Sequence, residues 1–453
     1  MQIGDSRDVP GSGNFAASFT FRFSECAARR HFTAGARTRF IDLLRLHVSD
    51  HCASRPRQLS QGFQGIAPRR GFPDAEAMMA EALQRAGRTE FSDISFLGPL
   101  KRLLQSYKCE SDLSPTGWYA TRFDIMRCLA NRLRLDAAEE ENPAIAKSVI
   151  RTPVFITGLP RSATTFFHAL LAQDPENAVP RCWRLLHPYP PEGSLAASFR
   201  KAQVEMELGL FRWMTPGIGS LHPLYADAPQ ECTDITAHIF QSLRFDTTHR
   251  IPSYQDWLDG HGHQEAFRFH KRFLQHLQAQ HADQRRWILK SPDHVFSLEA
   301  IRAVYPDAKI VFLHRDPVSV VASCAKLEEL LRRPFARHID RAEIGRHVSS
   351  RLVQATRRMM EAASQSNTIL HLHYRELVAA PMEAAAKLYR HCGRVLSPEA
   401  RRRMQAFAAG PAPKRTRKYS LAEFGLEAGS LREAFAPYTK AFAMDAELAA
   451  HVP

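Results

Sequence analysis

The stretch Val154-Phe-Ile-Thr-Gly-Leu-Pro-Arg-Ser-Ala-Thr-Thr-Phe-Phe-His-Ala-Leu-Leu171 decides the fold of this chain. It starts with a short apolar run at residues 154–157, turns at Gly158 and continues as a helix from near Ser162. The first N–H groups of a helix are unpaired and carry a partial positive charge, so a helix start behind a strand binds phosphate. The pattern therefore predicts a buried strand that ends in a phosphate-binding loop.

The side chains of this loop supply further anion-binding groups. Arg161 adds a permanent charge with several fixed donors, and Ser162, Thr164 and Thr165 add hydroxyls. A nucleotide-binding P-loop would need a glycine at position 163 and a lysine at position 164, where this chain has Ala163 and Thr164. Because that lysine is missing, ordinary ATP or GTP chemistry is the weaker interpretation.

Three further runs, at residues 287–289, 309–314 and 368–373, have the apolar composition of strands buried on both faces. Helical stretches separate them, which indicates parallel strands joined by crossover helices. We therefore expect an α/β protein with a P-loop-like three-layer fold around a central parallel sheet. Ligands of such sheets bind at the carboxyl ends of the strands, so the site is expected there.

We divide the chain into three parts. Residues 1–72 are rich in Gly, Ser and Arg and are expected to form a poorly ordered basic extension, with one short helix near residues 39–48. Residues 73–150 space their apolar side chains by three and four, which predicts a helical N-terminal region. Residues 151–453 hold the predicted α/β domain.

A second cluster of polar residues follows the predicted strands at residues 287–289 and 309–314. The sequence there reads Trp287-Ile-Leu-Lys-Ser-Pro-Asp-His294 and, after a helix, Lys309-Ile-Val-Phe-Leu-His-Arg-Asp-Pro-Val-Ser-Val-Val-Ala-Ser323. Arg315 follows a strand directly, and Ser323 lies about two turns into the next helix. Both can reach one phosphate over the edge of the sheet.

Together these stretches resemble the sulfotransferase family, whose members move a sulfuryl group from 3′-phosphoadenosine 5′-phosphosulfate (PAPS) to a hydroxyl or amine. Pro160-Arg-Ser-Ala-Thr-Thr165 is similar to the 5′-phosphosulfate loop of the family, and Arg315 and Ser323 match its 3′-phosphate pair in type and spacing. Ala163 replaces the usual glycine of that loop, and it would be strained if the position needs a positive φ.

The wider similarity is to a bacterial branch with a helical N-terminal extension. It runs from about residue 75 to about residue 440 and includes four short motifs: Asn131-Arg-Leu-Arg-Leu135, Leu171-Ala-Gln-Asp-Pro175, Pro229-Gln-Glu-Cys232 and Tyr419-Ser-Leu-Ala-Glu-Phe-Gly-Leu426. The family also has a basic tail that binds the 3′-phosphate, for which only residues 414–418 can stand in. A solvated basic loop is the alternative reading of that segment.

The resemblance implies the roles of individual residues. Phe166 would stack on adenine, Tyr374 would contact it, and Arg161 with Lys290 would stabilise the transferred group and the leaving phosphate. No metal is implied, because cations and helix-start amides can stabilise the transition state. The implied donor-binding residues are Gly158, Pro160, Arg161, Ser162, Ala163, Thr164, Thr165, Phe166, Arg315, Ser323, Tyr374, Lys414, Arg415 and Lys418. PAPS would be released as adenosine 3′,5′-bisphosphate.

A neutral acceptor hydroxyl also needs a general base. Three residues are candidates: Glu231 in a loop-like segment, His294 near the start of a helix, and His168 on the helix after the phosphate loop. Each has a structural alternative, since Glu231 can stabilise a helix start, His294 can be an ordinary helix residue and His168 can lie in the core. The sequence leaves the choice between them open.

Charge and composition limit the remaining classes of function. The 453 residues include 61 Lys and Arg against 47 Asp and Glu, a formal net charge of +14. A non-enzymatic polyanion binder is therefore one alternative, and a divergent P-loop kinase is another. No nucleic-acid module is recognisable and the basic residues are not interleaved with aromatic ones, so nucleic acid is not an expected partner.

The acceptor and the compartment are predicted only broadly. Residues 183–257 are rich in aromatic side chains, which favours an acceptor pocket with its lid for a small-molecule, carbohydrate or lipid acceptor; core packing is the alternative. No run approaches the roughly 18 apolar residues of a membrane span, so no integral membrane association is expected. The scattered cysteines and the lack of a signal-peptide pattern favour the cytoplasm. Nothing in the sequence predicts the oligomeric state.

Overall fold

The structure is a computed structural model that describes residues 72–280, 285–410 and 419–444. The expected basic extension, apart from its last residue, lies outside these ranges, and so do Lys414, Arg415 and Lys418. The described residues belong to one compact unit, Gly65–Pro453, so the predicted helical region and the predicted α/β domain fall in the same unit.

A five-stranded sheet in the order β2-β3-β1-β4-β5 forms the centre of this unit, and every pair of neighbours in it is parallel. Strand β1 lies in the middle and pairs along its whole length with β4, from Val154 opposite Lys309 to Gly158 opposite Leu313. The predicted central parallel sheet is confirmed. The strands are β1 Val154–Gly158, β2 Asn177–Ala178, β3 Arg286–Lys290, β4 Lys309–His314 and β5 Leu370–His373.

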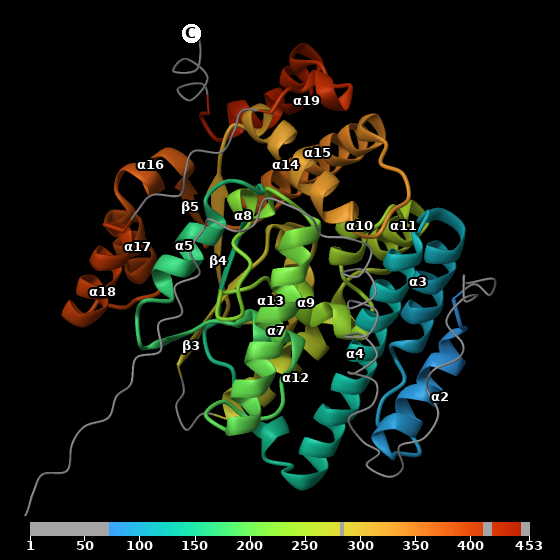
Figure 1. Cartoon of the computed structure of the whole chain (residues 1–453). Coiled ribbons are helices and arrows are strands. Elements are labelled where there is room, and N and C mark those ends of the chain that lie inside the picture. Colours follow the sequence, from blue (N-terminus) through green and yellow to red (C-terminus); the bar gives the residue numbers. More distant parts are fainter. Residues whose placement is uncertain (1–71, 281–284, 411–418, 445–453) are drawn as a thin grey trace, which may run out of the picture. The chain divides into compact units, whose positions relative to one another are not determined.

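Helices cover both faces of the sheet and complete the three predicted layers (Figure 1). Side chains of a strand alternate between faces, and so Val154 and Ile156 pack on one side while Phe155 packs on the other. The first side carries α5 Thr164–Leu171, α16 Tyr374–Ala379, α17 Pro381–His391 and α18 Pro398–Ala408. The second side carries α12 Gln264–Ala279, α13 Leu298–Val304, α14 Pro317–Arg332, α15 Arg341–Gln365 and α19 Ala428–Ala441.

The N-terminal helices are α2 Ala75–Ala86, α3 Leu97–Glu110 and α4 Pro115–Glu141. Helix α4 begins where Ser114 accepts a hydrogen bond from the Gly117 N–H, with Pro115 in the first turn, which is a favourable helix start. Apolar side chains of all three helices join the core cluster that also holds Phe155 and α12. The helical pattern predicted for residues 73–150 is therefore present as helices that share the core of the α/β layers.

The aromatic side chains of residues 183–257 include both buried and exposed ones. Phe240, Phe245 and Tyr254 lie fully inside the core, whereas Trp213 and Tyr225 are exposed. Among the described residues, no helix is long and apolar enough to span a membrane. The remaining helical elements are η1 Ile145–Lys147, α6 Cys182–Leu186, α7 Leu195–Met214, α8 Ile218–Leu221, α9 Thr233–Thr236, η2 Ala237–Ile239, α10 Arg244–Thr248, α11 Pro252–His261, η3 Pro292–Phe296 and η4 Ala422–Phe424.

Candidate active site

The loop between β1 and α5 has an unusual backbone. Arg161 and Ala163 both adopt the left-handed conformation, with φ of 66° and 64°. For Ala163 this is the strain expected from its place in the sequence, and such a conformation costs an L-residue about 1–2 kcal/mol. Gly158 has φ of 130°, and a Cβ there would lie 2.2 Å from the Leu313 carbonyl oxygen. The close approach at Gly158 thus holds the start of the loop against β4.

Arg161 and the residues near position 315 meet at the carboxyl ends of β1 and β4. The Arg161 Nε donates to the Ser323 Oγ at 3.1 Å, and its Nη1 donates to the Leu221 carbonyl oxygen. In turn, the Arg315 Nη1 donates to the carbonyl oxygen of Arg161. The Arg315 guanidinium also lies 4.0 Å above the centre of the Tyr374 ring. Two stretches more than 150 residues apart in the sequence therefore form one surface.

This surface is strongly positive. Within the described ranges, neither Arg161 nor Arg315 has a carboxylate partner. Burial lowers the pKa of Arg161, and the nearby Arg315 guanidinium acts in the same direction. The hydroxyl of Ser162 is buried without a hydrogen-bond partner in the described part of the chain. Two like charges and an unsatisfied hydroxyl at a helix start fit an anionic ligand such as a phosphosulfate.

Lys290 ends strand β3 beside the same loop. Its side chain is fully buried, and its Nζ lies 2.6 Å from the Glu231 Oε1 and 3.3 Å from the Thr165 Oγ1. The backbone fixes this arrangement, because the Cys232 N–H donates to the Lys290 carbonyl oxygen at 3.1 Å. Burial alone would raise the pKa of Glu231, but the Lys290 ammonium outweighs it and the pKa falls below its usual value. Glu231 is therefore a carboxylate at neutral pH.

The two histidines proposed as bases lie in the core. The His168 Nε2 donates to the Ile288 carbonyl oxygen at 3.0 Å, while burial and the Lys290 charge lower the pKa of His168 to about 3. His294 packs edge-on against the Phe155 ring, with centroids 5.1 Å apart, and burial lowers its pKa well below the usual value. Both imidazoles are therefore neutral and shielded at physiological pH.

Two ionisable residues near Glu231 were not predicted from the sequence. His222 follows α8 and is partly exposed; burial lowers its pKa, the Glu231 carboxylate opposes this, and Lys290 and Arg161 add to it. Burial and the Glu231 charge raise the pKa of Asp293 to about 7. The sequence features that could have pointed to them were weak. Asp293 lies three residues after Lys290, and His222, in a Leu-His-Pro motif, precedes Glu231 by nine residues.

The residues expected to hold adenine lie on helices α5 and α16. Phe166, on α5, stacks beside Phe407 of α18 with ring centroids 6.0 Å apart and planes at 28°. Tyr374 begins α16 directly after β5 and lies beneath Arg315. The Tyr374 ring thus borders the positive surface, and Phe166 lies on a helix of the same layer.

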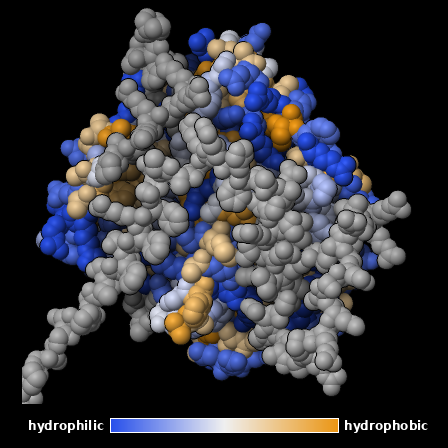
Figure 2. All heavy atoms as spheres, in the orientation of Figure 1, coloured by the Kyte–Doolittle hydropathy of each residue, from blue (hydrophilic) through white to orange (hydrophobic). Residues whose placement is uncertain are grey.

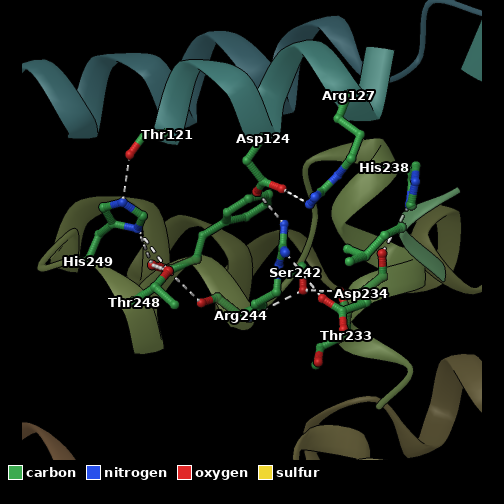
Figure 3. Close-up of polar contacts among 12 residues, drawn as sticks. Thr121, Asp124, Arg127, Thr233, Asp234, His238, Ser242, Arg244, Thr248 and His249 are labelled. Atoms are coloured by element: carbon green, nitrogen blue, oxygen red, sulfur yellow. Dashed lines mark hydrogen bonds and ion pairs between the residues drawn. The ribbon is translucent and has the colours of Figure 1, made fainter. Parts of the chain in front are cut away.

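A buried ion-pair network links the segment after Glu231 to helix α4 (Figure 3). The Arg244 guanidinium lies 2.6 Å from the Asp124 Oδ2 and 3.1 Å from the Asp234 Oδ1, and Arg127 pairs with the other oxygen of Asp124. Burial would raise the pKa of Asp124, but Arg244 and Arg127 lower it overall. Helix α4 therefore fixes the loop that carries Glu231.

A parallel α/β fold with an anion-binding loop after its central strand and cations at the ends of the neighbouring strands defines a class of enzymes that act on phosphorylated nucleotides. Residues 153–398, more than half of the chain, match the profile of the Sulfotransferase family. The chain belongs to this family, as predicted from its motifs.

The curated relatives are bacterial. The omega-hydroxy-beta-dihydromenaquinone-9 sulfotransferase Stf3 of Mycobacterium bovis, like its counterpart in Mycobacterium tuberculosis, is 26% identical over 256 residues. That match covers 55% of this chain and 65% of the relative, so the chain spans slightly less than two thirds of the length of these proteins.

Two solved sulfotransferases are similar over most of the chain. STF1 from Mycobacterium tuberculosis H37Rv has a TM-score of 0.70 and 28% identity, and the match covers 80% of this chain and 98% of that one. STF9 from Mycobacterium avium has a TM-score of 0.72 and 26% identity, covering 81% and 96%. The predicted fold class and the predicted bacterial branch of the family are confirmed.

Proposed function

We propose that this protein transfers a sulfuryl group from PAPS to the hydroxyl of a lipid acceptor. The observation that supports the donor is the positive surface formed by Arg161 and Arg315, which have no carboxylate partner in the described ranges. Family membership implies a sulfuryl donor. PAPS is the donor that the surface suits, because it presents two anionic groups at opposite ends of one nucleoside.

The donor would be held from both of its ends. The start of α5, the Ser162 hydroxyl and Arg161 would bind the 5′-phosphosulfate, while Arg315 and Ser323 would bind the 3′-phosphate. The Ser323 Oγ accepts a hydrogen bond from Arg161, so it already lies beside one of the two cations. The rings of Phe166 and Tyr374 would contact adenine, and Tyr374 already lies against the Arg315 guanidinium.

Transfer needs a cation at the reacting sulfur and a group that takes the acceptor proton. Lys290 lies next to Thr165 and would stabilise charge on the sulfuryl oxygens, while Arg161 would balance the charge of the leaving phosphate. The S–O bond to the leaving phosphate breaks as a new S–O bond forms to the acceptor oxygen. The products are a sulfate ester, adenosine 3′,5′-bisphosphate and one proton.

Glu231 is the proposed proton acceptor. Its carboxylate contacts Lys290 and is ionised at neutral pH, whereas the imidazoles of His168 and His294 lie in the core. Partly exposed His222 lies within the electrostatic reach of Glu231 and can pass the proton on to solvent. A carboxylate with a lowered pKa predicts that the rate stays level across neutral pH and falls only in acid.

The lipid acceptor is proposed from the curated relatives, whose names specify an omega-hydroxylated menaquinone. Such an acceptor combines a terminal hydroxyl with a long apolar chain. The described part of this chain also exposes apolar side chains on α7, which form the orange and tan band of Figure 2. Carbohydrate and small polar acceptors have no comparable support.

Nucleotide-dependent thermal stabilisation tests the donor. Adenosine 3′,5′-bisphosphate should raise the Tm without magnesium, and ATP with magnesium should have little effect. The reverse result would favour a divergent kinase, for which position 164 lacks the lysine.

Labelled PAPS and a lipid extract then test the transfer. Glu231→Gln should lower kcat by about 10²–10³ with little change in bisphosphate affinity. The control Glu299→Gln removes an exposed carboxylate on α13 and should leave both unchanged. Equal losses in the two variants would rule out Glu231 as the base.

A further inference from the structure

Three histidine side chains meet at the carboxyl ends of β4 and β5. His314 ends β4 and pairs with His373, the last residue of β5. The His314 and His371 rings stack with centroids 5.1 Å apart, and the His373 ring lies 5.4 Å from that of His314. Because side chains alternate along a strand, His314 lies on the same face as Phe312, which packs with α14, α15 and α19. A polar cluster therefore closes the end of an otherwise apolar layer.

A chain of two hydrogen bonds joins this cluster to helix α19. The His314 Nδ1 lies 2.7 Å from the Tyr438 hydroxyl oxygen, and its Nε2 lies 2.8 Å from the His371 Nδ1. Burial and the two neighbouring histidines lower the pKa of His314 well below its usual value, so the ring is neutral at physiological pH. A neutral imidazole has one N–H and one acceptor nitrogen. Both nitrogens of His314 are thus used in the chain.

These nitrogens do not have the geometry of a metal site. Two nitrogens bound to one tetrahedral zinc ion lie about 3.3 Å apart, whereas the facing nitrogens of His314 and His371 lie at hydrogen-bond distance. Within the ranges that the structure describes, no group of three or more His, Cys, Asp or Glu could hold a metal ion. The chain is therefore a link between α19, β4 and β5.

The two strands joined by this link lead directly into the proposed donor site. Arg315 follows His314, and Tyr374 follows His373. The Arg315 guanidinium lies 4.0 Å above the centre of the Tyr374 ring, and its Nη1 donates to the Arg161 carbonyl oxygen. The ends of β4 and β5 therefore set where these two side chains leave the sheet. The hydrogen-bonded chain holds those ends from the opposite side of the strands.

The composition of β4 supports a specific role for His314. Residues 310–313 of this strand are apolar and buried, and the histidine is the one polar residue among the last five. A buried imidazole costs free energy unless its nitrogens are hydrogen-bonded, and such bonds are directional, whereas apolar packing is not. An apolar side chain at position 314 could fill the same space, but it could not fix the orientation of the strand end in this way.

Helix α19 holds the far end of the chain in place. Its buried residues Leu431, Phe435 and Tyr438 pack in one cluster with α14 and α15, over which the helix lies (Figure 1). Phe442, four residues after Tyr438, places its ring 4.2 Å from that of His314. Tyr438 itself is fully buried. The hydroxyl is therefore fixed by packing, and it comes from a part of the chain beyond the family match at residues 153–398.

We propose that Tyr438 is a positioning residue of the donor site, which acts through His314 to hold the end of β4 and so orients Arg315 for the 3′-phosphate. This inference rests on the proposed function, which assigns Arg315 to the donor. Tyr438 lies beneath the sheet and contacts His314, not the donor. Loss of its hydroxyl should consequently change nucleotide affinity only through Arg315.

Titration calorimetry with adenosine 3′,5′-bisphosphate tests Tyr438→Phe, which removes the hydroxyl and keeps the ring. Affinity should fall about fivefold, as for the loss of one hydrogen bond, and the KM for PAPS should rise by a larger factor than kcat falls. Tyr305→Phe is the matched control. The Tyr305 hydroxyl lies 2.8 Å from the Nδ1 of buried His270, in the core between α12 and α13. Its loss should lower the Tm but leave affinity unchanged.

A double variant separates positioning from a general loss of stability. In an Arg315→Ala background, Tyr438→Phe should weaken bisphosphate binding no further, because the group through which it acts is gone. An equal effect of Tyr438→Phe in both backgrounds, or an equal effect of Tyr305→Phe on affinity, would overturn the inference. Unchanged affinity of Tyr438→Phe beside a weakened Arg315→Ala would also overturn it and leave the proposed function intact. If the wild type does not bind the bisphosphate, or Arg315→Ala binds it as tightly, both proposals fail.

Discussion

Two pairs of largely buried arginines have opposite surroundings. Arg127 and Arg244 lie against the carboxylates of Asp124 and Asp234, between α4 and the segment after Glu231. Arg161 and Arg315, at the carboxyl ends of β1 and β4, hold only carbonyl and hydroxyl oxygens among the described residues. The first pair is neutralised inside the protein, and the second pair has no carboxylate partner among the described residues, which is what the proposed binding of an anionic donor requires.

The pKa directions follow this difference. Burial disfavours the charged form of Arg244, but the carboxylates of Asp124 and Asp234 outweigh it and raise the pKa of Arg244 above its usual value. At Arg161 burial prevails, and the pKa is lowered. Burial alone thus does not distinguish a structural cation from a ligand-binding one; the presence of a carboxylate partner does.

Arg161→Ala should have the largest effect on the chemistry. Removing one preorganised donor from the leaving phosphate should lower kcat by about 10²–10³, because Arg161 is the cation that contacts Ser323 among the described residues. Single-turnover rates with labelled donor measure this. A loss below about fivefold would place the reacting group elsewhere.

Arg244→Ala should lower the free energy of unfolding by about 3 kcal/mol, because Asp124 and Asp234 would keep buried charges without their shared partner. Urea titration measures it, with Arg268→Ala as the control, since that ion pair is exposed and should contribute at most about 1 kcal/mol. If Arg244→Ala and Arg268→Ala lowered the free energy of unfolding equally, the buried ion pairs of Arg244 would not be structural.

Arg315→Ala should weaken binding of adenosine 3′,5′-bisphosphate by about 2 kcal/mol, or about 30-fold, since a charge-assisted hydrogen bond to phosphate is lost. Stability should change little, because Arg315 pairs with no carboxylate among the described residues. Titration calorimetry at constant salt checks this. An unchanged affinity would mean that the residues near position 315 do not bind the nucleotide.

Ala163→Gly should stabilise the protein by about 1 kcal/mol, because glycine adopts φ of 64° without the steric cost that alanine bears. Ala169→Gly, inside helix α5, is the matched control and should destabilise by about 0.5–1 kcal/mol. Thermal unfolding measures both. Destabilisation by both changes would show that the left-handed conformation carries no strain.

The same comparison can be made for two carboxyl groups, with a smaller expected effect. The pKa of Asp293 is raised to about 7, whereas the pKa of Asp124, which pairs with two arginines, is lowered. The folded state therefore binds a proton that the unfolded state releases between about pH 4 and pH 7, and stability falls as pH rises through that range. Asp293→Asn should remove this loss, so its Tm relative to wild type should be higher at pH 8 than at pH 5. A constant difference would show that Asp293 titrates normally.

Much of the fold could be predicted, because a parallel strand that is buried on both faces appears in the sequence as a short apolar run. The runs at 154–157, 287–289, 309–314 and 368–373 correspond to β1, β3, β4 and β5 within a few residues. Strand β2 was missed, since two residues, Asn177 and Ala178, carry no apolar pattern. Helix α5 begins at Thr164 and not near Ser162, because Ala163 adopts the left-handed conformation.

The site could be predicted where a motif follows a strand. Arg161, Lys290 and Arg315 are of this kind, since the end of a strand fixes their place. His222 and Asp293 could not be found this way, because their relation to Glu231 arises from tertiary packing. The sequence also could not predict that the candidate base His168 is buried, because tertiary packing decides whether a helix residue at that position faces the core or the ligand.

The ion pairs between α4 and α10 also determine how far the protein can be shortened before it is expressed alone or fused to another protein. Residues 153–398 carry the family match, yet they omit Asp124 and Arg127. A shortened protein starting at residue 151 would keep Arg244 and Asp234 but lose Asp124, the nearer of the two carboxylates that neutralise Arg244. Any chimera that borrows this catalytic domain should therefore carry helix α4 with it.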